Sequence, residues 1–263
     1  MELGLNNKIA VVTASSKGLG KAVAEALAQE GARLAICSRD ERRIYETGEY
    51  LKNTYHADVF ACVCDVEDRR SVDNFANEVI KKFGTAHILF TNSGGPPSGT
   101  LANFTTPDFE KALNLNLMSA INLVYAFLPY MKDQKWGRII ASTSITVKQP
   151  IPTLVLSNIS RVGVVAFIKS LSLEVAPFNI TANSVAPGYI MTDRVVQLYK
   201  DRARNENRPF EDAIKDLEKN IPPGRIGKPE EFGSLVAYLA SEKAAYINGA
   251  TILIDGGMYQ GLM

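Results

Sequence analysis

Short apolar runs alternate with longer amphipathic stretches along almost the whole chain, and this alternation limits the possible folds more than any other feature. Continuous apolar runs of this kind are typical of strands buried on both faces, whereas the stretches between them have helical periodicity. Parallel strands need crossover connections, which are right-handed. We therefore expect an α/β fold with a doubly wound, mostly parallel seven-stranded sheet and helices on both faces.

The same pattern places the elements within one domain, residues 1–263, because no linker-like shift in composition divides the chain. The predicted strands are Ile9–Thr13, Arg33–Ser38, 58–64, Ile88–Thr91, 138–142, 180–185 and Thr251–Ile254, and the predicted helices cover about 18–30, a stretch from 40, 68–83, 108–131, 154–175 and 229–239. The irregular stretch 191–227 follows a strand end, where ligands bind in open sheets. It is either a lid over the substrate or, given the mixed charge of 201–219, a solvated helical face.

Composition excludes several classes of function. The chain has 29 Lys and Arg residues against 28 Asp and Glu, so a net charge of +1 gives no drive toward nucleic acid or membranes. No apolar run approaches the ~18–20 residues that span a bilayer. Cys37, Cys62 and Cys64, with two histidines in the chain, favour buried thiols over a metal site. Unpaired thiols and a start unlike a signal peptide predict a cytoplasmic protein.

A glycine-containing turn, Thr13-Ala-Ser-Ser-Lys-Gly-Leu-Gly20, joins the first predicted strand to the first predicted helix. Glycines let the backbone approach a pyrophosphate, and the helix N-terminus offers free N–H groups. About twenty residues on, NAD enzymes place an acid for the ribose 2′-hydroxyl, but this chain has Ser38-Arg39. Arg39 and Lys17 are suited to a 2′-phosphate, although each alone is more often a surface charge. We expect NADP(H) to be preferred, with NAD(H) possible.

With these residues in view, the chain resembles the short-chain dehydrogenase/reductase family, most closely its 3-oxoacyl-acyl-carrier-protein-reductase-like members. The likeness covers nearly the whole chain. It rests on the turn Thr13–Gly20, on Asp65-Val66, on Thr91-Asn-Ser-Gly94, on Asn116-Leu117, on the run from Gly137 to Ser144, on Pro187-Gly-Tyr-Ile-Met-Thr192, and on Arg225–Glu231 and Asp255-Gly-Gly257. The resemblance implies a Rossmann fold, hydride transfer between a nicotinamide and a small-molecule carbonyl or alcohol, and a homotetramer or homodimer packed through 108–131 and 154–175.

Together, the turn and the resemblance predict two sets of site residues. The cofactor is expected at Thr13, Ser15, Ser16, Lys17, Gly18, Leu19, Gly20, Ser38, Arg39, Asp65, Val66, Asn92, Ser93, Gly94, Arg161, Pro187, Gly188, Ile190 and Thr192. The catalytic positions are expected at Asn116, Ser144, Ser157 and Arg161. Substrate contacts are expected in 94–101, 146–153 and 191–219.

Two departures from the family pattern matter. Ala14 stands at the first turn glycine, which is tolerable if its φ is negative. Thirteen residues past Ser144, at the position of the tyrosine in the family's YxxxK motif, stands Ser157, and Arg161 replaces the lysine. A phenol with a pKa of about 10 can protonate the developing oxyanion, but a serine hydroxyl is a far weaker acid and arginine stays charged. Losing a positioned acid typically costs about 10²–10⁴ in rate.

Ser157 and Arg161 can still contribute, since residues i and i+4 share one helix face. Arg161 could hold the nicotinamide ribose, Ser144 and Ser157 could bind the oxyanion, and a water near Asn116 could carry the proton. Each residue also has an alternative assignment. Ser157 could bond to its i−4 carbonyl, Arg161 could form a surface ion pair, and Asn116 and Ser144 could be ordinary buried polar residues.

Three functions remain open at this point. The first is an NADP(H)-dependent carbonyl reductase with an atypical proton route. The second is a catalytically weak or inactive NADP(H)-binding sensor or scaffold. The third is reduction of a conjugated double bond, where an enolate needs stabilisation more than immediate protonation.

Overall fold

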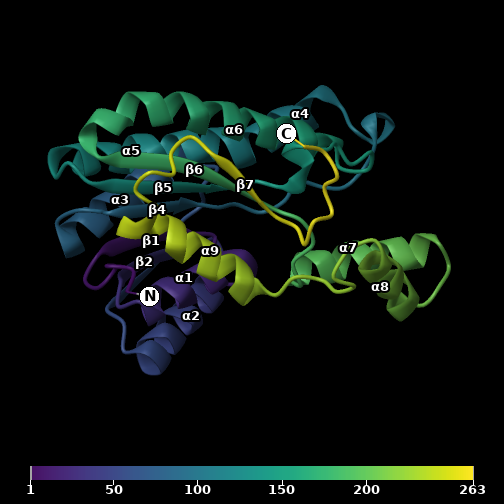
Figure 1. The fold of residues 1–263 in the computed structure, drawn as a ribbon, viewed down its shortest axis with the longest axis horizontal. Helices are drawn as coiled ribbons and strands as arrows, with labels where there is room; N and C mark the ends of the chain where they lie inside the picture. The colour runs from purple at the N-terminus through teal and green to yellow at the C-terminus, as the bar shows by residue number, and fades with distance from the viewer. Residues whose placement is uncertain (1, 263) are drawn as a thin grey trace.

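Seven parallel strands form one sheet in the order β3-β2-β1-β4-β5-β6-β7 in the computed structural model, which describes residues 2–262 (Figure 1). The strands are β1 (Ile9–Thr13), β2 (Arg33–Ser38), β3 (Val59–Val63), β4 (Ile88–Thr91), β5 (Gly137–Ser142), β6 (Ile180–Pro187) and β7 (Thr251–Ile254). The strand order runs outward in both directions from β1 and β4, so the crossovers change direction between them. The predicted doubly wound fold is confirmed, and its ligand crevice lies at this switch point.

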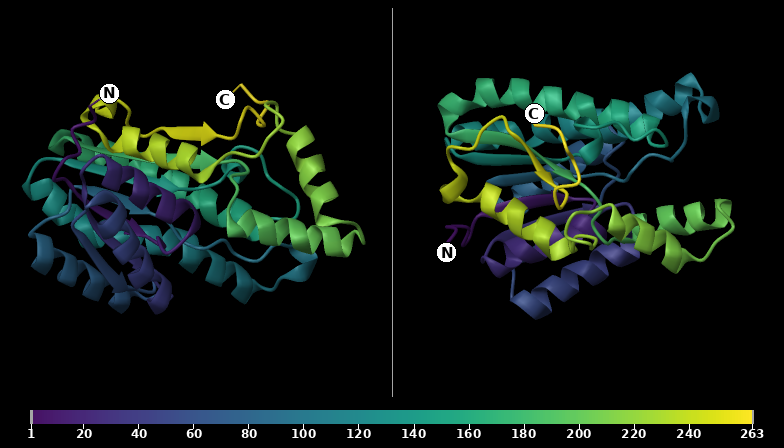
Figure 2. Two further views of the ribbon diagram at one scale, coloured as in Figure 1. Left: turned by 90° about the horizontal axis from the view of Figure 1, so that it is seen from below. Right: turned by 45° about the vertical axis from the view of Figure 1, so that its right-hand side comes forward.

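Helices cover both faces of the sheet because each presents an apolar stripe to it (Figures 1 and 2). On one face, α3 (Arg69–Phe83), α5 (Ser119–Asp133) and α6 (Val155–Val175) share an apolar core that includes Phe75 and Phe127. On the other, α1 (Gly18–Gln29), α2 (Glu41–Tyr55) and α9 (Pro229–Ala240) pack on a second core. The two layers explain why strands β1, β4, β5 and β6 are buried along their whole lengths.

One long helix carries a local irregularity that the sequence did not predict. It consists of α4 (Thr106–Leu113), a π-helical turn (Asn114–Met118) and α5, where a single regular helix was expected. By length and composition Thr106–Asp133 could cross a membrane, so the expectation that no stretch is long and apolar enough was wrong. One such helix is weak evidence for a membrane span, because core helices pass the same test and α5 packs in the core.

The segment 191–227 forms two helices that project beyond the end of the sheet (Figures 1 and 2). These are α7 (Asp193–Asn205) and α8 (Phe210–Lys219), which share a small apolar cluster of their own. Their outer faces carry ion pairs such as Arg202–Glu206, at 2.7 Å. The two sequence interpretations therefore describe different parts of one segment: a solvated outer face, and a first turn of α7 that reaches the crevice.

Candidate active site

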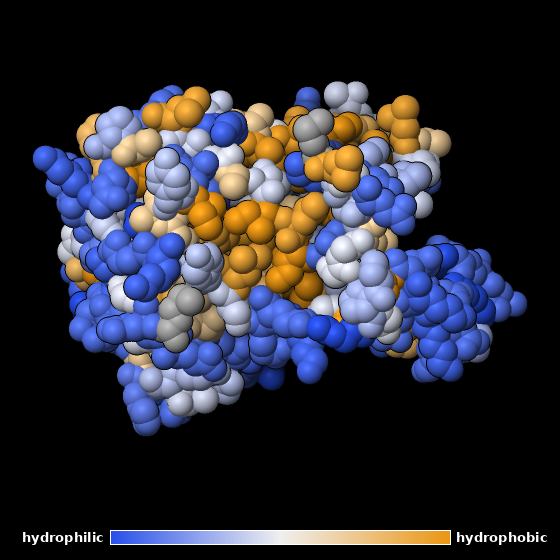
Figure 3. All heavy atoms as spheres, in the orientation of Figure 1, coloured by the Kyte–Doolittle hydropathy of each residue, from blue (hydrophilic) through white to orange (hydrophobic). Residues whose placement is uncertain are grey.

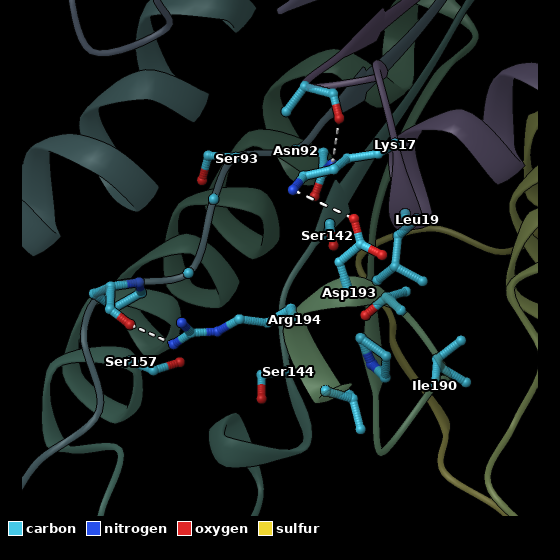
Figure 4. A pocket seen from close by; sticks show the side chains of 18 of the residues that line it. Lys17, Leu19, Asn92, Ser93, Ser142, Ser144, Ser157, Ile190, Asp193 and Arg194 are labelled. Atoms are coloured by element: carbon cyan, nitrogen blue, oxygen red, sulfur yellow. Dashed lines mark hydrogen bonds and ion pairs between the residues drawn. The ribbon is translucent and has the colours of Figure 1, made fainter. Parts of the chain in front are cut away.

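A cavity of about 660 Å³ opens at the carboxyl ends of β1, β2, β4, β5 and β6 (Figure 4). This volume is typical of a site for a cofactor or small molecule. Most of the predicted residues line it: Ser16, Lys17, Gly18, Leu19, Ser38, Arg39, Val66, Asn92, Ser93, Gly94, Ser144, Ser157, Arg161, Pro187, Gly188, Ile190 and Thr192.

Five predicted residues, Thr13, Ser15, Gly20, Asp65 and Asn116, lie behind this lining. The Thr13 hydroxyl donates to the Asn92 carbonyl at 2.7 Å and accepts from the Asn92 N–H at 2.9 Å, so it fixes the start of the loop after β4. The Ser15 hydroxyl donates to the Val12 carbonyl at 3.0 Å, and an Asp65 carboxylate oxygen accepts from the Glu67 N–H at 3.0 Å. These side chains support the wall of the cavity.

The glycine turn has the geometry of an anion cradle. A Cβ at Gly20 would lie 2.4 Å from the Ala14 carbonyl oxygen, so the residue must stay a glycine for turn and helix to approach. Lys17 is the N-cap of α1 and makes no side-chain cap, which leaves the first N–H groups of the helix free for a phosphate. Ala14 has φ +48°, not the negative φ on which its tolerance was expected to depend, so the turn carries backbone strain.

The two cations predicted to hold a 2′-phosphate each have a carboxylate partner. Arg39 Nη1 lies 3.0 Å from Glu67 Oε1, and Lys17 Nζ lies 3.4 Å from Asp193 Oδ2 at the start of α7. All four side chains keep contact with solvent, and surface pairs of this kind contribute little. Arg39 therefore stays available at the β2 end, while Lys17 links the turn to the projecting segment.

Asn116 lies in the π-helical turn and holds three parts of the site together. Its side-chain amide donates to Ser93 Oγ at 2.7 Å and to the Gly94 carbonyl at 3.1 Å, and its Oδ1 accepts from Ser160 Oγ at 2.9 Å. These bonds tie the loop after β4 to α6. Ser160 was missed by the sequence analysis, since a serine within a helix gives no distinguishing signal.

Ser144 follows β5, Ser157 and Arg161 lie in the first turns of α6, and all three line the cavity. Figure 4 shows Ser144 and Ser157 in it. Ser144 Oγ accepts from the Thr146 N–H at 3.2 Å, which orients it at the end of the strand. Arg161 Nη1 donates to the Ser142 carbonyl at 3.1 Å. Ser157 is buried, and its hydroxyl makes no hydrogen bond within residues 2–262, so it is not tied to its i−4 carbonyl.

Arg161 is a buried cation without a carboxylate partner among the described residues. Burial first, and then the positive charge of Arg194, lowers the pKa of Arg161 to about 10, so it remains charged at neutral pH. Arg194 lies on α7 and donates from Nη2 to the Pro96 carbonyl at 2.7 Å. The sequence analysis expected substrate contacts in 191–219, which includes Arg194, but it did not single this residue out.

No tyrosine or lysine stands beside Ser157 among the described lining residues. The phenol in the lining, Tyr189, packs its ring edge-on against Tyr199, at 5.8 Å between centroids, within the apolar cluster of the projecting segment. Among the described lining residues, the site thus offers hydroxyls and fixed positive charge, but no phenol next to them.

A glycine turn at a helix N-terminus, at the switch point of a doubly wound sheet and facing the cavity, is typical of dinucleotide-binding proteins of the Rossmann type. Residues 13–259 match the family model described as enoyl-(acyl carrier protein) reductase. The chain belongs to the short-chain dehydrogenase/reductase family, as its motifs predicted.

Three known proteins show how far the similarity extends. The 3-oxoacyl-[acyl-carrier-protein] reductase FabG of Aquifex aeolicus is 30% identical over 259 residues, which are 98% of this chain and 100% of that protein. L-sorbose reductase from Gluconobacter frateurii, solved with NADPH and L-sorbose, has a TM-score of 0.96 at 30% identity over 100% of both chains. An NADPH-bound short-chain oxidoreductase from Pseudomonas aeruginosa PAO1, which contains an atypical catalytic center, has a TM-score of 0.85 at 31% identity, covering 97% of this chain and 99% of that one.

Proposed function

We propose that this protein is an NADP(H)-dependent oxidoreductase that reduces a carbonyl group without a tyrosine–lysine pair. One observation carries the proposal: a single cavity joins the glycine turn to the Ser144, Ser157 and Arg161 cluster. The NADPH in two structural neighbours supports the choice of cofactor, and the atypical catalytic center of one of them shows that this family includes departures from its usual site.

The residues present fit NADP(H). The close approach of Gly20 to Ala14 leaves the free N–H groups of α1 open to a pyrophosphate. The segment after β2 offers Arg39 and no carboxylate at the position that would repel a 2′-phosphate. Pro187 and Gly188 line the same cavity at the end of β6, where they would hold the nicotinamide, and Thr192 lies beside Gly18 of the glycine turn. When bound, the cofactor would supply or accept the hydride.

Ser144 and Ser157 would donate hydrogen bonds to the substrate oxygen as negative charge develops on it. Arg161 would stabilise the same charge as a fixed cation, because its burial makes the interaction strong. Its bond to the Ser142 carbonyl holds its guanidinium in place. Asn116 would act as a positioning residue for the loop after β4. The proton would come from solvent at the cavity mouth, which completes the alcohol.

The test combines binding and turnover. We expect calorimetry to show tighter binding of NADPH than of NADH, and absorbance to show slow NADPH oxidation with a panel of keto-sugars, oxoacyl thioesters, quinones and aldehydes. Ser157→Ala and Ser144→Ala should lower kcat, and Ser170→Ala, an exposed serine on the same helix, should not. Turnover should be level from pH 6 to 9, since no phenol lies beside Ser157. Failure of both dinucleotides to bind at millimolar concentration would refute the proposal.

A second candidate is an NADP(H)-binding sensor with weak or no catalysis, which the lack of a phenol beside Ser157 favours. Restoring the pair with Ser157→Tyr and Arg161→Lys should then create turnover in a protein that has none. Native turnover above the uncatalysed rate would exclude an inactive sensor. The third possibility, double-bond reduction, agrees with the description of the matching family model and is tested by an enoyl thioester in the same panel.

We also propose a homodimer or homotetramer located in the cytoplasm. Tyr125 on α5 and Leu173 on α6 are 66% and 70% exposed, which leaves apolar surface on both long helices. Apolar side chains also gather over the β7 edge of the sheet (Figure 3), where β7 is half-buried. Edge strands and apolar patches of this kind are commonly covered by another chain. Light scattering of the purified protein would measure its mass directly.

A further inference from the structure

Two arginines face the part of the cavity that contains Ser157. Arg161 donates one hydrogen bond, to the Ser142 carbonyl, and its other N–H groups have no acceptor among residues 2–262. Arg194 crosses from α7 to the Pro96 carbonyl, and Figure 4 shows its guanidinium extending toward Ser157. Building on the proposed carbonyl reduction, we propose that Arg161 and Arg194 bind an oxyanion group, a carboxylate or a phosphate, on the substrate.

The charge balance of the cavity supports this assignment. Its described lining has four cations, Lys17, Arg39, Arg161 and Arg194, and two carboxylates, Asp40 and Asp193. Asp193 pairs with Lys17 at 3.4 Å, and Asp40 accepts from the N–H of Arg43 as the N-cap of α2. Neither carboxylate therefore neutralises the arginine pair.

The mutual effect of the two arginines points the same way. Burial lowers the pKa of both guanidiniums, and the charge of Arg194 lowers that of Arg161 further. The acid that acts on Arg194 is Asp201, two turns along α7, and it also bonds with Gln197 and Arg204. Two positive charges in a partly buried pocket repel one another, and the attraction of both to a bound oxyanion would offset that repulsion.

The position of the pair separates this anion from the phosphates of the cofactor. Those phosphates belong at the N-terminus of α1, beside Gly18. In Figure 4, Lys17 and Leu19 of that turn lie on one side of Arg194, and Ser157 and the loop after Ser93 lie on the other. A guanidinium fork matches a carboxylate or a phosphate with two parallel hydrogen bonds. The anion would therefore be a substrate group near the carbonyl that Ser157 receives.

The experiment compares Arg194→Gln with a charge-matched control on the same helix. Arg204 is exposed and pairs with Asp201 at 3.6 Å, so Arg204→Gln removes one positive charge away from the cavity. The probes are benzoylformate with its methyl ester, and dihydroxyacetone phosphate with dihydroxyacetone. The wild-type protein should favour the charged member of one pair, which identifies carboxylate or phosphate. Arg194→Gln should lower kcat/KM for that member about 10- to 100-fold and for its neutral partner less than about 3-fold, and Arg204→Gln should change neither.

A binding measurement keeps this proposal separate from the proposed reduction. Mandelate and glycerol 3-phosphate are titrated by calorimetry into the NADP⁺-saturated protein, which requires no turnover. If Arg194→Gln weakens anion binding about 10-fold or more, the anion site is supported. If the same protein reduces none of the probes, the result counts against the proposed reduction. Equal losses for charged and neutral substrates, or no anion binding at millimolar concentration, would overturn the anion site and leave Arg194 as a contact between α7 and Pro96.

Discussion

Replacing Arg161 by methionine should make the ligand-free protein more stable while removing its activity. Arg161 is buried, lacks a carboxylate partner among the described residues and lies within the field of Arg194. These causes lower its pKa from 12.5 to about 10, which corresponds to about 3 kcal/mol against the charged form in the folded state. At neutral pH the side chain is charged in both the folded and unfolded states. The full destabilisation is therefore present there, and it is relieved only as the pH rises through about 10.

The net gain is smaller than this figure, because Arg161→Met also leaves the Ser142 carbonyl without its donor. An unpaired buried acceptor costs about 1–2 kcal/mol, so we expect the free energy of unfolding to rise by about 1–2 kcal/mol. For a chain of this length that corresponds to roughly 4 °C in Tm. Urea titration and calorimetry of the ligand-free protein measure both quantities.

Arg138 supplies the matched control, since it too is a fully buried arginine. Its guanidinium donates to the carbonyls of Gly137, Asn179 and Ser241 and lies 3.6 Å from a Glu242 carboxylate oxygen. Arg138→Met leaves several acceptors unpaired and should lower stability by about 3 kcal/mol. If Arg161→Met were destabilised like Arg138→Met, Arg161 would be a structural arginine and the reasoning above would be wrong.

Three further predictions follow from single sites. Ala14→Gly should relieve the positive φ and raise stability by about 1 kcal/mol, or roughly 2 °C in Tm, in a thermal melt; a lower Tm would show that the turn is unstrained. Arg39→Ser should weaken NADPH binding about 10-fold or more with little effect on NADH, while Glu67→Gln, which frees Arg39, should strengthen NADPH binding; calorimetric titration of both dinucleotides decides. Burial, and then Lys8, lower the pKa of His87 to about 4, so the unfolded state takes up a proton first and stability falls as the pH drops from about 6.5 to 4. After allowance for its partial exposure that loss is roughly 1–2 kcal/mol, and urea titrations across this range should show a flatter curve for His87→Gln.

The sheet and most helices could be predicted because their signals are local and repeated. Each strand is a continuous apolar run, and most strand ends lie where the sequence placed them. The structure shortens 58–64 by one residue at each end, adds Gly137 to β5 and extends β6 to Pro187. The π-helical turn at Asn114–Met118 could not be predicted in the same way. The apolar pattern of this turn continues that of the flanking helices. Asn116 within it donates to Ser93 and Gly94 and accepts from Ser160, and these partners are distant in sequence.

In the candidate site, too, some residues could be predicted from local sequence and others could not. Residues that belong to a recognisable motif, such as Gly18 and Pro187, lie in the cavity lining. Lys17, which was expected to suit a 2′-phosphate together with Arg39, also pairs with Asp193 at the start of α7, a contact that the sequence did not indicate. Arg194 lies in the segment where substrate contacts were expected, but its position in the cavity could not be predicted for the same reason. The path of 191–227 depends on an apolar cluster that also includes Tyr189 and Met258, and no sequence spacing defines where such a segment reaches.

In the proposed reaction, Ser157 and Arg161 stand where the family pattern has a phenol and an ammonium, and they would assist a different part of the chemistry. A phenol lowers the barrier by giving a proton, and it must recover that proton in every turnover. A buried arginine gives no proton at neutral pH, but its charge is present before, during and after the reaction, and burial makes that charge effective. Such a cation destabilises the empty protein, so it is best retained where a bound anion or a developing oxyanion offsets its charge. The same reasoning links two features of the described residues around Ser157 and Arg161: with neither a phenol nor a carboxylate next to them, this part of the cavity would be suited to negative charge on a substrate.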